Sequence, residues 1–466
     1  MRKDVINDLA QLFETPYEAF PPEAVEAAKK LIIDILATTT AGSTAQIIPE
    51  LANYYAQLGG RPDSSVFVYG DKIPAPNAAM INAAMGHSRD WDDTLEDIVI
   101  HETVSMIPTC FAVAEQMGNV SGKDFLKAII VGCDVTSRIG YGAGWGSIQS
   151  GWNFTSLLSY FGCAMAASYL KGQSIEQIAN SAGIVLSQAG GAVQPVNDAV
   201  LTKRCQPGFA AFAGTQAANW TEFGLTGCRN VLEGKSAFYN NYFRGNYTHD
   251  NIVKDLGAFW HIVNLSFKLY PCCRFTHCAI DCAKKLMAKY NITADEVISV
   301  DAGTSSHGHA TVCEPVEVRT HPKTLVETQF SIPFTVAYAL VHGNVDLNTF
   351  EPENRADPKV LELCAKVKTY VDEEIEEKYN FGCPPTRLTI HTKRGDFTDL
   401  VLHASGSIEE MIDMDQVVAK YMSTKPFAAR PVKDGAFENI VELVKALDSC
   451  DNVNVLIDAV NNAFER

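Results

Sequence analysis

An apolar segment that ends in a dense group of charges constrains the fold of this chain most. Residues 78–85 read Ala-Ala-Met-Ile-Asn-Ala-Ala-Met, and both alanine and methionine favour a helix. Five ionisable side chains then follow within seven residues: His87, Arg89, Asp90, Asp92 and Asp93. Charges at the end of a buried helix are costly unless they pair or take part in chemistry. The segment therefore predicts either a functional site or a capped helix junction with solvated acids.

The spacing of these residues leads to two further expectations. If the helix continues through the charges, Asp90 and Thr94 lie four residues apart and share one face, while Asp93 points elsewhere. After a break, His101 precedes a second predicted helix that starts near residue 103. The positive end of that helix would lower the pKa of the imidazole and keep it available as a neutral base.

Composition limits the partners of the chain. Its 466 residues allow two or three domains with a sizeable core. A net charge of −17 argues against nucleic acid and against an anionic membrane surface, although a few focused cations can still hold an anionic substrate. There is no secretory signal, no apolar run of membrane-spanning length, and an odd number of cysteines, thirteen. We therefore expect a cytoplasmic protein with reduced thiols.

Hydrophobic periodicity predicts the fold class. Helical spacing dominates up to about residue 265, and the chain returns to helix from residue 414. Four segments read as strands: residues 65–70, 296–302, 388–392 and 400–403, the last two joined by a turn at 393–396. We therefore expect a mainly α protein. Residues 1–266 and 406–466 would form a large all-helical domain, and residues 267–405 a smaller α+β domain.

Two further polar clusters are candidates for binding an anion. Lys268 and Arg274 flank a tight proline turn and suit a carboxylate, although such a pair is also typical of a solvated surface. An adjacent pair, Lys203 and Arg204, lies just before a helix start between two small-residue helices. This position favours a lined pocket over the surface where such pairs usually lie. The stretch at residues 327–334, taken alone, indicates a core helix.

Other kinds of site fit the sequence less well. The cysteines near His277 are adjacent or run into an apolar helix, so they suit small buried hydrophobes better than zinc. His307 and His309 lack an evident third metal ligand. The glycine-rich residues 140–146 lack the Lys-Ser/Thr of a phosphate loop. There is no nucleophile elbow, and no single cysteine stands out as a nucleophile.

Taken together, the motifs resemble those of the MmgE/PrpD family, which includes 2-methylcitrate dehydratase, cis-aconitate decarboxylase and iminodisuccinate epimerase. The family's Asp-aromatic-Asp-Asp-Thr signature is matched by residues 90–94, followed by His101. Its Lys-x-Tyr-Pro-x-Cys-x-x-x-His motif is matched by residues 268–277. Its Lys-Arg…Pro-Gly-x-Ala-Ala stretch is matched by residues 203–211, and its Phe-Ser-x-x-Tyr helix start by residues 330–334, with phenylalanine in place of the tyrosine.

The resemblance implies an architecture and a site. It implies an all-helical domain built from both chain ends, an inserted α+β domain, a homodimer and no cofactor. The active site would lie between the two domains, lined by six residues: Asp90, Thr94, His101, Lys203, Lys268 and His277. Two positions differ from the cis-aconitate decarboxylases, which have histidine where this chain has Asn153 and tyrosine where it has Phe334. The usual proline after the family's signature histidine is also replaced, by Glu102. A proton donor and a phenol are therefore replaced.

The chemistry expected from these residues is proton transfer at a carbon next to a carboxylate. Lys203, Lys268 and Arg274 would hold carboxylates and the developing charge, with Thr94, Asn153 and Phe334 as further substrate contacts. His101 would be the general base or acid, with Asp90 orienting it or sharing its proton and His277 as a second catalytic group. We expect a cofactor-independent lyase, dehydratase-like, on a small di- or tricarboxylate. An isomerase or epimerase of a similar acid, or a decarboxylase, is the alternative. A non-catalytic scaffold does not account for the motifs.

Overall fold

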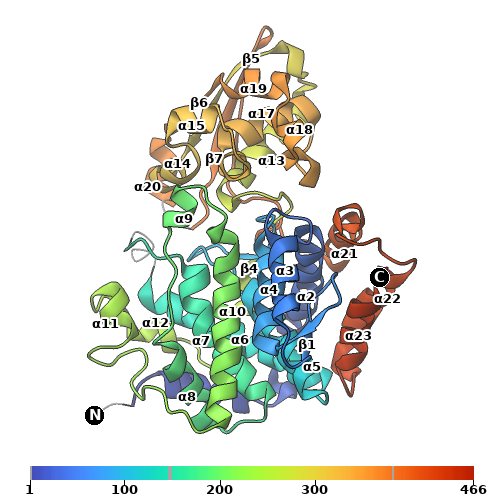
Figure 1. Cartoon of the computed structure of the whole chain (residues 1–466). Coiled ribbons are helices and arrows are strands. Elements are labelled where there is room, and N and C mark those ends of the chain that lie inside the picture. The colour runs from blue at the N-terminus through green and yellow to red at the C-terminus, as the bar shows by residue number, and fades with distance from the viewer. Residues whose placement is uncertain (1–2, 145–149, 380–381, 466) are drawn as a thin grey trace. The chain divides into compact units, whose positions relative to one another are not determined.

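The structure, a computed structural model, describes residues 3–144, 150–379 and 382–465. These residues form two compact units (Figure 1). Unit 1 consists of Met1–Pro195, Leu201–Leu265 and Asp413–Arg466, and unit 2 of Val196–Val200 and Ser266–Ile412. Helices make up most of the ordered elements, and a four-stranded sheet lies in unit 2, so the predicted mainly α class is confirmed. Whether residues 267–405 fold as a domain by themselves stays a prediction.

Helix α10 (Thr202–Glu222) organises unit 1, because it packs against both α7 (Phe154–Leu170) and α4 (Ala75–His87). Small residues make this close packing possible. A Cβ on Gly208 would lie 2.5 Å from the carbonyl oxygen of Met80 in α4, and a Cβ on Gly214 would lie 2.8 Å from the main-chain nitrogen of Ala164 in α7. The small-residue runs in the sequence are therefore a packing requirement of three adjacent helices.

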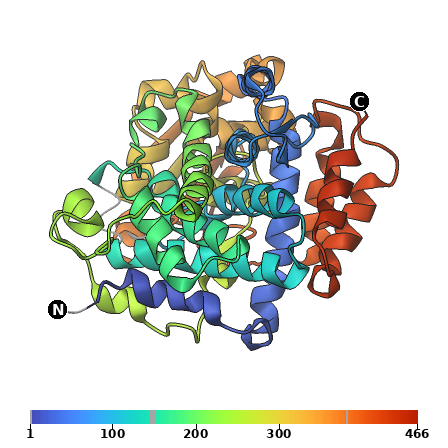
Figure 2. The same ribbon diagram turned by 60° about the horizontal axis from the view of Figure 1, so that its bottom comes forward.

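Both ends of the chain contribute to unit 1. Helix α21 (Met414–Ser423) and helix α22 (Ala436–Lys445) pack against α2 (Pro22–Gly42), as Figures 1 and 2 show in red beside blue. The other helices of this unit or its borders are α1 (Ile6–Gln11), α3 (Ile48–Leu58), α5 (Thr103–Met117), α6 (Gly122–Ala143), α8 (Ile175–Val185), α9 (Gln194–Asn197), α11 (Phe238–Phe243), α12 (His249–Val253) and α23 (Asn454–Asn462). Among the described residues, no helix combines the length and apolar character needed to cross a bilayer.

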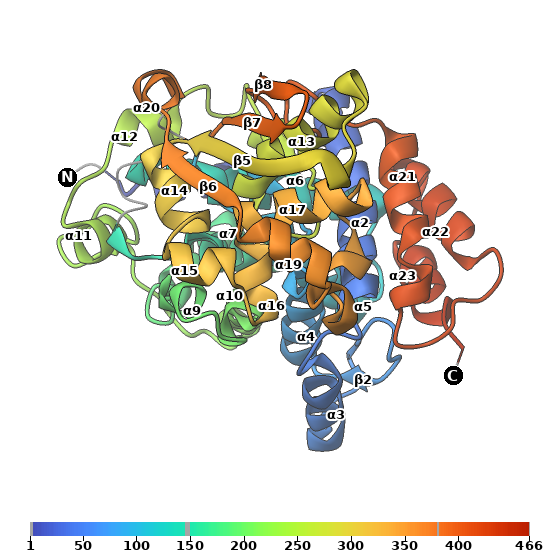
Figure 3. The ribbon, with the colours of Figure 1, turned by 90° about the horizontal axis from the view of Figure 1, so that it is seen from above.

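Unit 2 is built on a sheet with the strand order β6-β5-β7-β8 (Figure 3). Strand β5 (Val297–Thr304) runs parallel to β6 (Val367–Val371) and antiparallel to β7 (Thr386–Thr392), which pairs with β8 (Gly395–Val401). Helix α13 (His277–Tyr290) packs on β7 and β8. The remaining helices are α14 (Ser306–Val312), α15 (Val316–Thr320), α16 (Leu325–Gln329), α17 (Ile332–His342), α18 (Pro352–Arg355), α19 (Pro358–Cys364) and α20 (Glu373–Tyr379).

The strand predictions are right for the central strands and wrong at the margins. Residues 297–302 of the predicted segment 296–302 lie in β5, and the predicted segment 388–392 lies in β7. The second hairpin strand begins at Gly395, ahead of the predicted start at residue 400, because the turn is shorter than expected. Strand β6 was not predicted, since only its first residue, Val367, is buried and no alternation marks it. Of residues 65–70, only Ser65 is in a strand, β1 (Ser64–Ser65), which pairs with β2 (Lys72–Ile73).

The glycine-rich segment is partly described. Its first residues belong to the end of helix α6, and Gly144 follows as the C-cap with a φ of 73°. Residues 145 and 146 lie outside the described residues. The short strands β3 (Thr94–Leu95) and β4 (Leu265–Ser266) complete the described elements that matter for the site.

Candidate functional site

The charged segment after helix α4 is a turn, not a continuation of the helix. Helix α4 ends at His87, and Asp90 has a positive φ of 54°, a conformation that aspartate tolerates better than most residues. Thr94 lies in strand β3. The expectation that Asp90 and Thr94 share a helix face is therefore wrong. The turn instead directs successive carboxylates to different partners.

Asp90 pairs with Lys203, which lies in the first turn of helix α10. The ammonium nitrogen of Lys203 is 2.7 Å from Oδ2 of Asp90, and both residues are buried. Arg204 is buried as well, so this basic pair does not lie on the surface, where such pairs usually lie. A buried ammonium and a buried carboxylate are tolerated in a core only when each is paired. Helix packing therefore places a cation at the end of helix α4.

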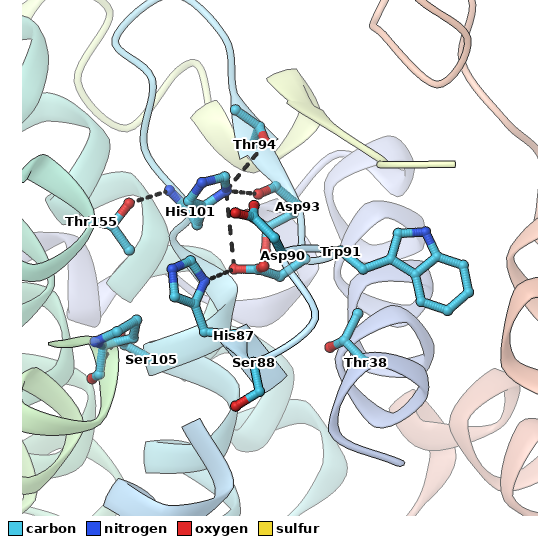
Figure 4. Close-up of polar contacts among 12 residues, drawn as sticks. Thr38, His87, Ser88, Asp90, Trp91, Asp93, Thr94, His101, Ser105 and Thr155 are labelled. Carbon is cyan, nitrogen blue, oxygen red and sulfur yellow. Dashed lines mark hydrogen bonds and ion pairs between the residues drawn. The ribbon is translucent and has the colours of Figure 1, made fainter. Parts of the chain in front are cut away.

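His101 lies just before helix α5, with its imidazole held by the segment that precedes it (Figure 4). Its Nδ1 is 2.5 Å from the main-chain carbonyl oxygen of Asp93 and 3.2 Å from Oγ1 of Thr94. A carbonyl oxygen can only accept a hydrogen bond, so Nδ1 carries the proton and the lone pair of the neutral ring is on Nε2. The side chain is 13% exposed. This is the tautomer in which Nε2 can accept a proton.

Asp93 caps helix α5 and so fixes the carbonyl that holds His101. Its carboxylate accepts hydrogen bonds from the Thr103 hydroxyl and from the main-chain N–H of Glu102 at 3.2 Å. Burial, together with the charge of Asp92, raises the pKa of Asp93 to about 7. The sequence predicted only that Asp93 points away from the face shared by Asp90 and Thr94. In the structure its carboxyl group caps helix α5, because an acceptor at a helix N-terminus satisfies otherwise unpaired N–H donors.

Glu102, which directly follows His101, is also buried. Its carboxyl group accepts a hydrogen bond from the Ser137 hydroxyl at 2.7 Å. Burial raises the pKa of Glu102 well above its ordinary value. Glu102 therefore adds to the core a carboxyl group whose burial disfavours the charged form.

A second histidine, His87, lies beside the first. Its Nδ1 is 2.8 Å from Oδ2 of Asp92, and both side chains are buried. The same Oδ2 is 4.0 Å from Nδ1 of His101, and the two imidazole centroids are 5.3 Å apart. Burial lowers the pKa of His87, although the neighbouring carboxylate acts in the opposite direction. The sequence marked these residues as a cluster without assigning a role to His87 or Asp92.

Lys420 fixes the same turn from the C-terminal end of the chain. Its ammonium nitrogen lies 2.7 Å from Oδ1 of Asp34, donates to the main-chain carbonyl of Trp91 at 2.7 Å, and lies 4.4 Å from the Trp91 ring centroid. Sequence reasoning missed this residue. A single lysine in an amphipathic helix, 329 residues away from its acceptor, carries no local signal.

The N-terminal turn of helix α7 completes the surroundings of His101. Oγ1 of Thr155 accepts the main-chain N–H of His101 at 3.0 Å. Asn153, the N-cap of α7, donates its side-chain amide to Oε1 of Gln206 at 2.6 Å, one turn after Lys203 in α10. Among the predicted residues of unit 1, the structure therefore brings Asp90, Lys203, Thr94, His101 and Asn153 to the ends of neighbouring elements.

The predicted residues of unit 2 lie at the start of helix α13 and in the segment that precedes it. Lys268 and His277 are fully buried, and Arg274 is 3% exposed. Arg274 donates to the main-chain carbonyls of Ser405 at 3.0 Å and Ala404 at 3.3 Å, and its Nη1 lies 3.0 Å from Nδ1 of His277. A guanidinium can only donate, so Nδ1 of His277 is the acceptor and Nε2 carries the proton. The interpretation of Arg274 as a solvated cation is wrong.

The remaining predicted contacts lie in the core of unit 2. Phe334 is fully buried, with its ring centroid 6.0 Å from that of Tyr338 and 6.3 Å from that of Phe350. Its role as a substrate contact stays a prediction. Cys272, Cys278 and Cys282 are buried. Within the described ranges, no group of three or more His, Cys, Asp or Glu side chains is arranged to hold a metal ion.

Comparison with known proteins gives one consistent result. The model of the MmgE/PrpD N-terminal domain matches residues 8–250, and that of the MmgE/PrpD C-terminal domain matches residues 270–445. A cis-aconitate decarboxylase of Aspergillus terreus is 26% identical over 95% of this chain and 92% of that protein. The cis-aconitate decarboxylases of Mus musculus and Homo sapiens are each 24% identical over 93% of this chain, covering 88% and 89% of their own lengths.

Proposed function

Because the chain belongs to the MmgE/PrpD family, we propose that it is a cofactor-independent lyase that acts on a small di- or tricarboxylate. The observation that supports this best is the tautomer of His101. The Asp93 carbonyl holds the proton on Nδ1, so Nε2 is the acceptor of the neutral ring. A base of this kind can take a proton from a carbon next to a carboxylate and return it to carbon or oxygen.

The same chemistry needs positive charge, because the carbanion formed next to a carboxylate is a dianion. Lys203 supplies a buried ammonium whose position is fixed by Asp90 at 2.7 Å. A preorganised cation in a water-poor site stabilises developing negative charge far better than the same group in water. In this proposal Lys203 binds the substrate carboxylate and Asp90 positions the lysine. Thr94 and Asn153 are proposed as polar contacts of the substrate.

The motif at residues 268–277 in unit 2 adds three residues to the proposed site: Lys268, Arg274 and His277. Lys268 is a second buried cation, and the neutral ring of His277 carries its proton on Nε2, where it can donate a hydrogen bond. Arg274 is bound to main-chain carbonyls and to His277, so we propose that it positions the histidine rather than contacting substrate. Family resemblance also supports a homodimer, which light scattering on the purified chain would test.

Loss of water is the reaction that we favour. Elimination requires a base for the carbon-bound proton and an acid for the departing hydroxyl group, and His101 can serve as both, because the proton taken up by Nε2 can be passed on to the hydroxyl group. Decarboxylation is the second candidate, favoured by relatives that are cis-aconitate decarboxylases at 24–26% identity. Asn153 argues against a direct transfer of that activity, because its amide does not donate a proton where the decarboxylases have a histidine.

Reaction in heavy water distinguishes these activities. The purified chain is incubated with a panel of di- and tricarboxylates, including cis-aconitate and 2-methylcitrate, and products are followed by NMR and mass spectrometry. A mass change of one water with deuterium at the reacting carbon supports the hydro-lyase. Release of carbon dioxide supports the decarboxylase, and deuterium uptake with inversion alone supports the epimerase. If no acid on the panel exchanges or turns over, or if the His101→Asn variant is as active as the parent, the proposal is wrong.

A further inference from the structure

One carboxylate in unit 1 lies between two imidazoles. Oδ2 of Asp92 is 2.8 Å from Nδ1 of His87 and 4.0 Å from Nδ1 of His101, and the two rings are 5.3 Å apart. The histidines belong to separate parts of the chain, one ending helix α4 and the other preceding helix α5 (Figure 4). The arrangement is therefore produced by the packing of two helices and the turn that joins them.

The contact with His87 fixes the carboxylate in one orientation. A carboxylate accepts the hydrogen bond, so His87 carries a proton on Nδ1 and donates it to Asp92. His87 is 1% exposed and Asp92 has no exposed surface, so neither side chain has solvent to turn into. Burial lowers the pKa of His87, which keeps the ring a neutral donor at pH 7. The negative charge of Asp92 is therefore not neutralised by its nearest histidine.

His101 is the group on which that charge acts. When Nε2 accepts a proton, the ring becomes an imidazolium, with its Nδ1–H still held by the Asp93 carbonyl. An anion 4.0 Å away in a buried environment favours the charged form of the ring by much more than the same anion would in water. The other ionisable groups near the two rings include the paired Asp90 and Lys203, whose charges oppose each other, and two buried carboxyl groups with raised pKa values, Asp93 at about 7 and Glu102.

We propose that His87 and Asp92 are positioning residues for His101: His87 orients the Asp92 carboxylate, and the carboxylate stabilises the protonated form of His101. The principle is that of a buried carboxylate behind a catalytic histidine, with a second imidazole holding the carboxylate in place. The role of His101 as the base is that of the proposed function. The electrostatic link between the three residues is a property of the folded chain, and it is measurable without a substrate.

Titration of His101 by NMR is the direct test. The chain is labelled with ¹³C,¹⁵N-histidine, and the His101 signal is assigned by its loss in the His101→Asn variant. In the Asp92→Asn variant we expect the midpoint of the His101 titration to fall by about one pH unit, because a nearby anion has been removed. Asp97→Asn removes the same charge from an exposed position in the same loop and serves as the matched control. Its midpoint should stay within about 0.3 unit of the parent.

Two substitutions of His87 separate orientation from packing. His87→Gln keeps a side-chain N–H donor, whereas His87→Leu removes it at similar size. We expect the midpoint in the leucine variant to move toward that of Asp92→Asn, and the glutamine variant to lie closer to the parent. These variants also keep the proposal testable if Asp92→Asn does not fold. Equal midpoints in the parent and in every folded variant would overturn it.

Kinetics on an identified substrate provide the second measurement. Asp92→Asn should lower kcat by roughly tenfold to a hundredfold and move the acid limb of the kcat/KM profile to lower pH, with little change in KM. A purely structural role would change stability without moving the acid limb. If the NMR midpoint does not move but the parent is an active lyase, this inference fails and the proposed function stands. If the midpoint moves but no acid turns over, the proposed function fails.

Discussion

The two polar clusters of this protein use their buried cations in different ways. In unit 1, cations meet carboxylates: Lys203 pairs with Asp90 at 2.7 Å, and Lys420 pairs with Asp34 at 2.7 Å. In unit 2, the guanidinium of Arg274 donates to main-chain carbonyls and to His277 instead. Both side chains of an ion pair can be mutated together to a neutral pair. A cation that donates to main-chain carbonyls has no side-chain partner that could be mutated with it.

The clusters also hold their imidazoles in opposite tautomers. A main-chain carbonyl keeps the proton of His101 on Nδ1, and a guanidinium keeps the proton of His277 on Nε2. The first ring presents an acceptor at Nε2 and the second a donor. The comparison teaches that a histidine's role is set by what holds its other nitrogen, and it can be tested one cluster at a time.

Removal of the acceptor imidazole should have the largest effect. His101→Asn is expected to lower kcat/KM by about 10³-fold, because a positioned general base contributes roughly 10²–10⁴ to the rate. Steady-state kinetics on a substrate from the panel measures it. His403→Asn, an exposed histidine in unit 2, is the matched control and should keep parental activity. A His101→Asn variant within tenfold of the parent would assign the base elsewhere.

Substitution of the Asp90–Lys203 ion pair tests whether a second mutation can restore the stability that the first one removes. Lys203→Gln leaves the Asp90 carboxylate buried without its ammonium and should cost about 3 kcal/mol of unfolding free energy. The double variant Asp90→Asn with Lys203→Gln should recover most of that stability in urea unfolding. Turnover should stay about 10²-fold low in both, since the cation for the substrate is gone. Recovery of turnover in the double variant would remove Lys203 from the site.

Arg274→Gln is the corresponding change in unit 2. It removes hydrogen bonds from a charged donor to several buried acceptors, so we expect a loss of about 3 kcal/mol in urea unfolding. Arg394→Gln is the control, because its ion pair with Glu296 lies at the surface, and its urea midpoint should stay close to that of the parent. If both arginine variants unfold at the same urea concentration, Arg274 does not hold the fold.

A histidine of unit 1 should lower the stability of the chain at acidic pH. Burial lowers the pKa of His261 from 6.5 to about 3, so between these values the unfolded chain binds a proton that the native chain does not. Stability is therefore lost as the pH falls below 6.5. His261→Phe keeps a ring against Tyr141 and Phe259 but cannot titrate. From pH 7 to pH 5 the parent should lose about 2 kcal/mol more than the variant in urea unfolding. Equal losses would contradict this account.

A histidine on the sheet of unit 2 should change stability with pH in the opposite direction, and this effect should be the smallest. Hydrogen bonds to Asp396 and Asp301 raise the pKa of His391 above 6.5. Its stabilising contribution is present below pH 6.5 and is lost as the pH rises through the folded-state pKa. His391→Gln should therefore destabilise the chain at pH 5.5 by less than about 1 kcal/mol, and by even less at pH 9. Thermal unfolding at the two pH values measures it, and a larger loss at pH 9 would reverse the assignment.

The sequence predicted the mainly helical character and most of the two central strands, β5 and β7, and its motifs nominated the candidate site residues. Runs of alanine and glycine predicted close-packed helices, and the small residues Gly208 and Gly214 are where helices α4, α7 and α10 meet. The motif positions of His101 and Lys203 were visible without any structure. Local composition and periodicity reach one helix or one turn, so these features are encoded within a short stretch of chain.

Only the tertiary structure determined which side chains form hydrogen bonds and ion pairs with one another. Asp90 was expected to orient His101, but packing of helix α10 against helix α4 pairs it with Lys203. The roles of Asp92 and Asp93, and the involvement of Lys420, had no signal in the neighbouring sequence. Hydrogen bonds and ion pairs depend on distances of about 3 Å between segments that are far apart in the chain. Only the packing of those segments fixes such distances, and with them the tautomer and charge of each group.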